Sequence, residues 1–462
     1  MKRPTGIAGW LPWSILKNRR EMTVLIKILQ FILSLSVIVI IHELGHFLFA
    51  KLFKTRVEKF YLFFDPWFSL FKFKKGETEY GIGWLPLGGY VKIAGMIDES
   101  MDREQMKKPP QPYEFRSKPS WQRLIIMLGG VFFNFILAIV LYVIVLFSWG
   151  ETYLPTDNVK YGIVTDSIGH EMGLMDGDKI VTIDGMHIEN FYEIIPDIIL
   201  NEREQITVER DGQPVQINID RKYIPHIIKG KGGIDARLPF TPFEIVDFDK
   251  ESPAKEAGMQ IGDKLVGIDG REFRFNDEYV HYLSDKKGKE ITANILRGDD
   301  SLTIDLKTTD EGMLGIFRST AGLLELRTIK YGFFESVPAG ISKGYQTMKD
   351  YLKQFKLIFS KDTKAYESLG GFITIGSIFP GMWDWHAFWN LTAFLSIILA
   401  IMNILPIPAL DGGHVMFLLY EVITGRKPSD KFLEYAQLAG MLILIALLIY
   451  ANGNDILRLL RK

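Results

Sequence analysis

One stretch near the start of the chain decides the fold: Thr23–His46, with the sequence TVLIKILQFILSLSVIVIIHELGH. Its first 19 residues carry a single charge, Lys27, and about 20 apolar residues are enough for a helix to cross a bilayer. This apolar run leads directly into His42, Glu43 and His46. Ionisable side chains are costly at membrane depth, so their presence there indicates a function. The stretch predicts a membrane-spanning helix with a reactive site at its end.

Three more apolar segments are long enough to cross a membrane. They are Leu124–Gly150, which has 27 residues and no charge, Ala387–Leu410 and Tyr435–Asn454. Mean hydropathy is +0.10, which is high for a chain with 24% charged residues. The alternative, buried helices of a soluble core, is disfavoured by three such uninterrupted runs. We therefore expect a polytopic α-helical membrane protein with four transmembrane helices.

Composition excludes several kinds of site. The chain has 462 residues, with 54 Lys and Arg against 55 Asp and Glu, so no net positive field draws it to nucleic acid, and no nucleic-acid partner is expected. It contains no cysteine, which rules out disulfides, iron–sulfur clusters and thiol nucleophiles. Any metal site must therefore use histidine and carboxylate ligands.

The motif His42-Glu43-Leu44-Gly45-His46 has the HExxH pattern. Residues four apart lie on one face of a helix, so both imidazoles can bind one Zn²⁺. Glu43 borders that face and can act as the general base on a water held by the metal. Five residues with two free positions recur by chance, but no lipid-facing structural role suits two histidines and a glutamate inside an apolar helix.

A catalytic zinc usually has a third protein ligand and one open position. The candidate is Asp411, in the sequence NILPIPALDGG at residues 403–413. Two prolines break the helix there, and a broken backbone at membrane depth lines a cavity or is packed in protein. Asn403 and Asp411 would then point inward. Two alternatives stay open: Asp411 as a helix-end carboxylate at the interface, and His414 as a ligand.

A sequence repeat lies between the second and third apolar segments. GLMDGDKIVTIDG at residues 173–185 returns as GMQIGDKLVGIDG at residues 258–270, with a constant offset of 85. Each copy has Gly-Asp before an alternating strand and Asp-Gly as a tight turn. We expect two β-rich domains over 151–225 and 226–310 that resemble bacterial PDZ domains, which bind peptides by strand addition. The alternative is a pair of structural spacers.

Loop charge predicts the orientation in the membrane. Residues 51–118 hold 13 Lys and Arg, which favours the cytoplasmic side and places residues 151–370 outside. The basic extension over residues 1–21 conflicts with this orientation unless the chain starts at Met22. The predicted organisation is a membrane core over 22–150 and 387–462, the two β-rich domains, and an amphipathic linker over 311–386.

Together, HELGH, the two repeats and NxxPxPxLDGG resemble intramembrane metalloproteases of the site-2 protease family, of the regulator of sigma-E protease type. The resemblance implies zinc on His42, His46 and Asp411, with Glu43 as general base and Asn403 in substrate handling. It also implies that Glu79–Ile93 is a membrane-associated, re-entrant β-hairpin whose Gly88, Gly89 and Tyr90 hold an extended substrate. A cytoplasmic hairpin is the alternative.

The resemblance further implies a location and partners. It places the chain in the bacterial inner membrane, in contact with the lipid bilayer, with both PDZ domains on the periplasmic side. Substrates would be single-span proteins of the anti-sigma factor or remnant signal peptide type, and the PDZ domains would bind peptides. Two other functions fit parts of the sequence: an inactive membrane-anchored PDZ scaffold, and a metal transporter using the same ligands.

Overall fold

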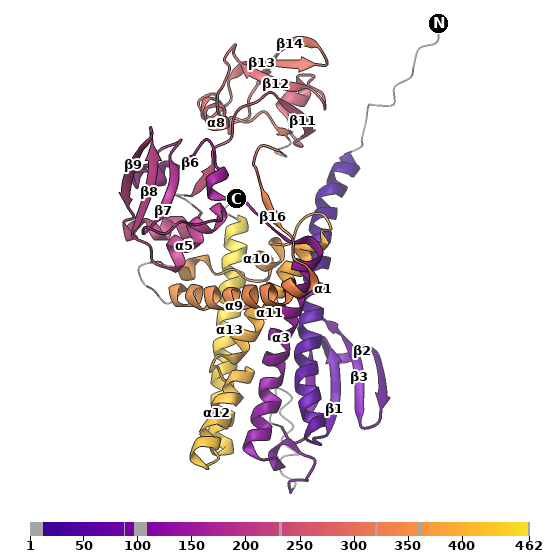
Figure 1. Ribbon diagram of the computed structural model, residues 1–462. Coiled ribbons are helices and arrows are strands. Elements are labelled where there is room, and N and C mark those ends of the chain that lie inside the picture. Colours follow the sequence, from indigo (N-terminus) through magenta and orange to yellow (C-terminus); the bar gives the residue numbers. More distant parts are fainter. Residues whose placement is uncertain are drawn as a thin grey trace. The chain divides into compact units, whose positions relative to one another are not determined.

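Figure 1 shows the computed structural model, which describes residues 13–86, 88–96, 109–230, 233–318, 322–358, 360, 363 and 365–460. Internal contacts divide the chain into two compact units. We call the first the helical unit; it comprises Met1–Gly150, Lys330–Lys356 and Leu369–Lys462. The second, the β-rich unit, comprises Glu151–Ile329 and Leu357–Ser368.

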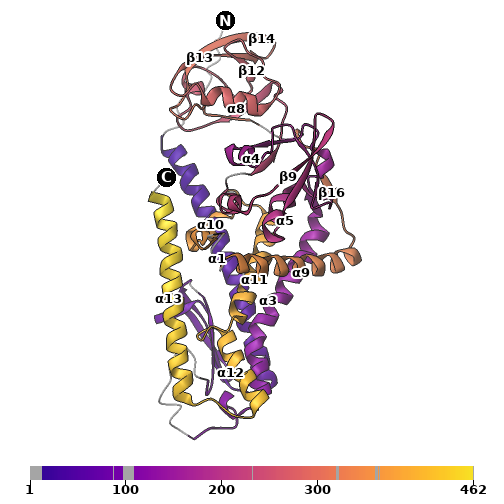
Figure 2. The ribbon, with the colours of Figure 1, turned by 90° about the vertical axis from the view of Figure 1, so that its left-hand side faces the viewer.

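Within the described residues, four helices of the helical unit are long and apolar enough to cross a membrane, as the sequence predicts. They are α1 (Trp13–Leu52), α3 (Ser120–Trp149), α11 (Trp385–Ile404) and α13 (Asp430–Leu460). Figure 2 shows them running alongside one another. Helices α1 and α3 touch at glycines: a Cβ on Gly45 would lie 2.2 Å from the carbonyl oxygen of Gly129. Small residues at such a crossing let two backbones approach closely.

Among the described residues, this unit also contains α9 (Phe333–Ile358), α10 (Phe372–Ser377) and α12 (Asp411–Thr424). Helix α9 lies across the long helices in both views (Figures 1 and 2). Its Gly340 packs against α3, where an added Cβ would lie 2.8 Å from the backbone nitrogen of Val143. Within the predicted amphipathic linker over 311–386, this long helix begins at Phe333.

A four-stranded sheet follows α1. Its strands are β1 (Val57–Leu62), β2 (Phe64–Lys75), β3 (Thr78–Leu85) and β4 (Tyr90–Ile93), in the order β2-β3-β1-β4. The prediction of a hairpin over Glu79–Ile93 is wrong, because β1 lies between β3 and β4 and is parallel to the first and antiparallel to the second. This register buries Val57 and Ile93 in a cluster with residues of α1 and α3. The burial of these apolar side chains therefore decides the order of the strands.

Both halves of the β-rich unit contain a sheet and short helices. The first half has β6 (Ile163–Thr165), α4 (Ser167–Glu171), β7 (Lys179–Ile183), α5 (Ile194–Leu200), β8 (Gln205–Arg210), β9 (Gln213–Asn218), α6 (Ile224–Ile228) and β10 (Ile234–Ala236). The second has β11 (Phe243–Phe248), α7 (Pro253–Glu256), β12 (Lys264–Ile268), α8 (Asn276–Ser284), β13 (Glu290–Arg297), β14 (Asp300–Lys307) and β15 (Ile316–Arg318). Strands β5 (Glu151–Tyr153) and β16 (Arg327–Ile329) pair with each other.

In the described parts of the chain, five single turns of 3₁₀ helix connect these elements: η1 (Phe115–Ser117), η2 (Thr156–Asn158), η3 (Phe191–Glu193), η4 (Arg221–Tyr223) and η5 (Ala365–Ser368).

The two halves share their turns but close differently. Asp184-Gly185 and Asp269-Gly270 both adopt positive φ, as the tight-turn signal requires. In the first half, β10 pairs with β6 as a separate two-stranded sheet. In the second, β15 joins β11 at the edge of a five-stranded sheet. Strand β10 lies beyond the predicted boundary at 225, and β15 lies beyond the predicted boundary at 310. Neither strand belongs to the repeated motif, so the repeat gives no signal for it.

Candidate metal centre

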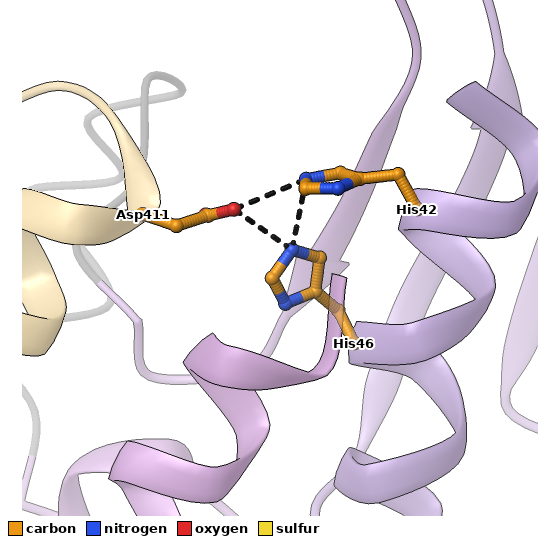
Figure 3. Close-up of side chains that lie close together, drawn as sticks. All are labelled: His42, His46 and Asp411. Atoms are coloured by element: carbon orange, nitrogen blue, oxygen red, sulfur yellow. Dashed lines mark hydrogen bonds and ion pairs between the residues drawn. The ribbon is translucent and has the colours of Figure 1, made fainter. Parts of the chain in front are cut away.

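Two buried histidines of α1 face one carboxylate. His42 and His46 are each 7% exposed, and the start of α12 brings Asp411 against them (Figure 3). Oδ2 of Asp411 lies 3.0 Å from Nε2 of His42 and 3.3 Å from Nε2 of His46. The two Nε2 atoms are 3.3 Å apart. The structure thus brings together the three residues that the sequence proposes as metal ligands.

The break after α11 is what delivers Asp411. Helix α11 ends at Ile404, Leu410 is extended, and Asp411 is the first residue of α12. The next two glycines allow this sharp return: a Cβ on Gly412 would lie 2.1 Å from the carbonyl oxygen of Leu405, and one on Gly413 would lie 2.6 Å from Cα of Pro408. The LDGG sequence therefore supplies both the carboxylate and the room to place it.

This arrangement fits a bound cation. Nδ1 of His46 lies 2.9 Å from the carbonyl oxygen of Ile126, which can only accept a hydrogen bond. A neutral imidazole with its proton on Nδ1 has a bare lone pair on Nε2. That lone pair faces Oδ2 of Asp411, a buried atom with no hydrogen bond among the described residues. Converging lone pairs repel one another unless a cation lies between them, and two histidines with one carboxylate suit zinc.

Glu43 lies beside these ligands and not among them. It lines the same cavity, of about 670 Å³, and a Cβ on Gly89, just before β4, would lie 3.6 Å from its Cγ. His414 also lines this cavity. Within the part of the chain that the structure describes, the group of donor atoms that could hold a metal comprises His42, His46 and Asp411, without His414.

Only some of the residues predicted to bind substrate line the cavity. Gly89 and Tyr90 line the cavity, whereas Gly88 packs against the ring of Phe64 and is not part of the lining. Nδ2 of Asn403 lies 3.2 Å from Nε2 of His42, at the ligand face. A Cβ on Gly89 would lie 2.7 Å from Cγ1 of Val39, so glycine is needed where β4 approaches α1.

Sequence reasoning missed the contribution of α3. Ile126, Gly130 and Asn134 follow one another at intervals of four and therefore share a helix face. A Cβ on Gly130 would lie 2.5 Å from Nε2 of His46 and 2.5 Å from Cε1 of His42. The available signal was the single asparagine within the uncharged Leu124–Gly150 run.

Comparison with known proteins places the chain. The model of peptidase family M50 matches residues 30–447. The chain belongs to this family. The regulator of sigma-E protease RseP of Escherichia coli is 29% identical, covering 93% of this chain and 98% of its own. The regulator of sigma E protease of Haemophilus influenzae is 28% identical with the same coverage, and protease RseP of Yersinia pestis is 27% identical over 95% of this chain and all of its own.

These matches confirm the prediction of a metalloprotease of the site-2 protease type. Among solved structures, a PDZ domain from an SdrC-like protein of Listeria monocytogenes is 24% identical. It covers 18% of this chain and 90% of its own, with a TM-score of 0.16. The assignment of the two halves of the β-rich unit as PDZ domains therefore stays a prediction.

Proposed function

We propose that this member of family M50 is a zinc-dependent endopeptidase that cleaves peptide bonds in or near the transmembrane segments of single-span proteins. Its main support is that Nε2 of His42 and Nε2 of His46, on a helix long enough to cross a membrane, meet Oδ2 of Asp411 from the start of α12. These three residues would hold zinc, and one position would stay open for water and substrate.

Glu43 carries the proton transfers in this proposal. Zinc, when bound, supplies Lewis acidity and lowers the pKa of water. The Glu43 carboxylate takes a proton from the attacking water as the water oxygen bonds to the scissile carbonyl carbon. Glu43 then delivers that proton to the amide nitrogen as the carbon–nitrogen bond breaks. Glu43 lines the same cavity as the three ligands, which supports this role.

Strand β4 offers the substrate an extended template. It is an edge strand of its sheet, and Tyr90, Val91 and Lys92 line the cavity beside the ligands. A transmembrane helix hides its peptide bonds, so the substrate must unwind before hydrolysis, and pairing with an open strand edge satisfies the backbone groups that unwinding exposes. Gly89 and Tyr90 would contact this strand, and the amide of Asn403 would bind it on the ligand side.

The remaining features support a location and a substrate class. The basic 51–118 loop favours an inner-membrane orientation with the β-rich unit in the periplasm. The two repeats of the β-rich unit would act as PDZ domains that admit or dock substrates already trimmed on the periplasmic side. The substrates would be anti-sigma factors or remnant signal peptides, as the family resemblance implies.

The test compares the purified full chain with Glu43→Gln in detergent, using a labelled single-span peptide and measuring bound metal alongside cleavage. We expect both proteins to hold one zinc per chain and the variant to lose cleavage by about 10²- to 10⁴-fold, the usual contribution of a general base. Zinc-loaded wild type that cleaves none of a panel of trimmed spans would overturn the proposal and favour an inactive scaffold.

A further inference from the structure

The side chain of Asn134 is buried where an apolar helix has no evident need of an amide. It is fully buried, in the middle of α3. Among the described residues, its amide has one hydrogen-bond partner: Nδ2 lies 3.2 Å from Nδ1 of His42. Its Oδ1 has no hydrogen-bond partner within the described ranges. Burying an amide with an unmade hydrogen bond destabilises a fold, so its position calls for a function.

The His42 ring can bind a metal through Nε2 only if that atom presents a lone pair. In neutral imidazole, the proton must then be on Nδ1, which needs an acceptor. A half-turn of the Asn134 amide about its terminal bond exchanges Nδ2 and Oδ1. Oδ1 then accepts the Nδ1–H of His42, and Nε2 is left bare toward Asp411.

The second histidine has an equivalent partner on the same helix. The backbone carbonyl of Ile126 accepts from Nδ1 of His46 at 2.9 Å. Ile126 and Asn134 are eight residues apart on one face of α3, with Gly130 between them leaving room for both rings. Each ligand ring is thus held from behind by α3, once by a backbone oxygen and once by a side chain.

We propose that Asn134 is a positioning residue for the metal centre: its amide oxygen accepts Nδ1–H of His42 and so fixes the ring and tautomer that bind zinc through Nε2. This inference rests on the proposed zinc site. Acceptors behind a ligating histidine typically contribute 10- to 100-fold to metal affinity. Asn134 itself touches neither substrate nor metal in this proposal.

The experiment measures zinc affinity in the full-length chain in detergent, by competition with a chromogenic chelator. Asn134→Leu removes the acceptor at similar volume, and we expect it to weaken zinc binding by about 10- to 100-fold. Asn134→Asp keeps an oxygen acceptor at the same reach, and we expect affinity within a few-fold of wild type. A role in packing alone would not be rescued by a buried carboxylate, which is costly without a partner.

The matched control is Ser396→Ala. Ser396 is also fully buried, and its hydroxyl donates to the backbone oxygen of Asn134 at 2.8 Å, so its removal perturbs the same packing without touching His42. We expect its zinc affinity to be unchanged. The d–d absorption of the Co²⁺-loaded proteins gives a second readout, expected to change for Asn134→Leu and not for Asn134→Asp.

Three outcomes separate the hypotheses. If wild type binds no zinc, the proposed function fails. If wild type binds zinc and Asn134→Leu binds it equally well, only the role of Asn134 fails. If Asn134→Leu does not fold, Asn134→Asp provides the test. A zinc affinity of Asn134→Asp that is reduced as strongly as by substitution of a ligand would also overturn the inference.

Discussion

Two buried aspartates of the β-rich unit differ from Asp411 of the helical unit in how their carboxylates are satisfied. In the β-rich unit, Asp178 and Asp263 are each 1% exposed, and both carboxylates are fully bound. Arg210 donates to Asp178 from Nε and Nη2, both at 2.7 Å, and Arg297 donates to Asp263 from the same atoms at 2.8 Å. A backbone N–H completes each site, from Met175 in the first half and Gln260 in the second.

Asp411 in the helical unit is different. Its Oδ2 is buried and faces two imidazole nitrogens, and no hydrogen bond satisfies it among the residues described. A buried charge without donors is unstable unless a cation is supplied. Burial alone therefore does not identify a functional carboxylate. A satisfied carboxylate stabilises a fold, whereas an unsatisfied one among lone pairs marks a ligand site.

The largest expected effect comes from removing the charge of Asp411. Asp411→Asn keeps the side-chain size and loses the anionic ligand, so we expect zinc affinity to fall by more than about 100-fold, beyond the effect of outer contacts. Cleavage should disappear with it, while thermal unfolding of the β-rich unit stays unchanged. Zinc titration and a melting curve on the same preparation measure both effects.

Asp178→Asn is the matched control for that change. It should weaken the first half of the β-rich unit and leave zinc affinity intact, the reverse of Asp411→Asn. If Asp411→Asn binds zinc with wild-type affinity, the carboxylate of Asp411 is not needed as a ligand. His414 would then be the candidate for the third ligand.

An intermediate effect is expected from Arg297→Leu. The substitution leaves Asp263 buried without its cationic partner, which we expect to lower the free energy of unfolding of the second half. The measurement is limited proteolysis in urea, followed by identification of the fragments. Lys179→Met serves as control: its ion pair with Glu209 is 3.8 Å long and exposed, so it should matter little. Equal losses for both variants would contradict the expectation.

The smallest effect is the pH dependence of that difference. The hydrogen-bonded Arg297 holds the pKa of Asp263 below its ordinary 3.8, so the pair stabilises the fold above that pH. This stabilisation fades as pH falls through the lowered pKa. The gap in unfolding midpoint between wild type and Arg297→Leu should therefore be constant from about pH 7 to pH 5 and shrink below about pH 4. A gap that persists undiminished at about pH 3 would refute this assignment.

Local patterns in the sequence predicted well wherever the physics is local. The apolar runs predicted the four membrane-length helices, since length and hydropathy alone decide whether a helix can span. The repeat predicted the two Asp-Gly turns, because positive φ favours those residues. The prediction of a hairpin over Glu79–Ile93 failed for the opposite reason: nothing local in that stretch reveals that β1 lies between β3 and β4.

By itself, the sequence determined the spacing of His42 and His46, the broken segment before Asp411, and hence the kind of ligands available. Only the tertiary structure decided that Asp411, 365 residues after His46, reaches the same point, and that α3 holds both rings from behind. Helical periodicity fixes which residues share a face. Which faces meet depends on packing between distant segments, here on glycines such as Gly45 and Gly130 that let the helices approach.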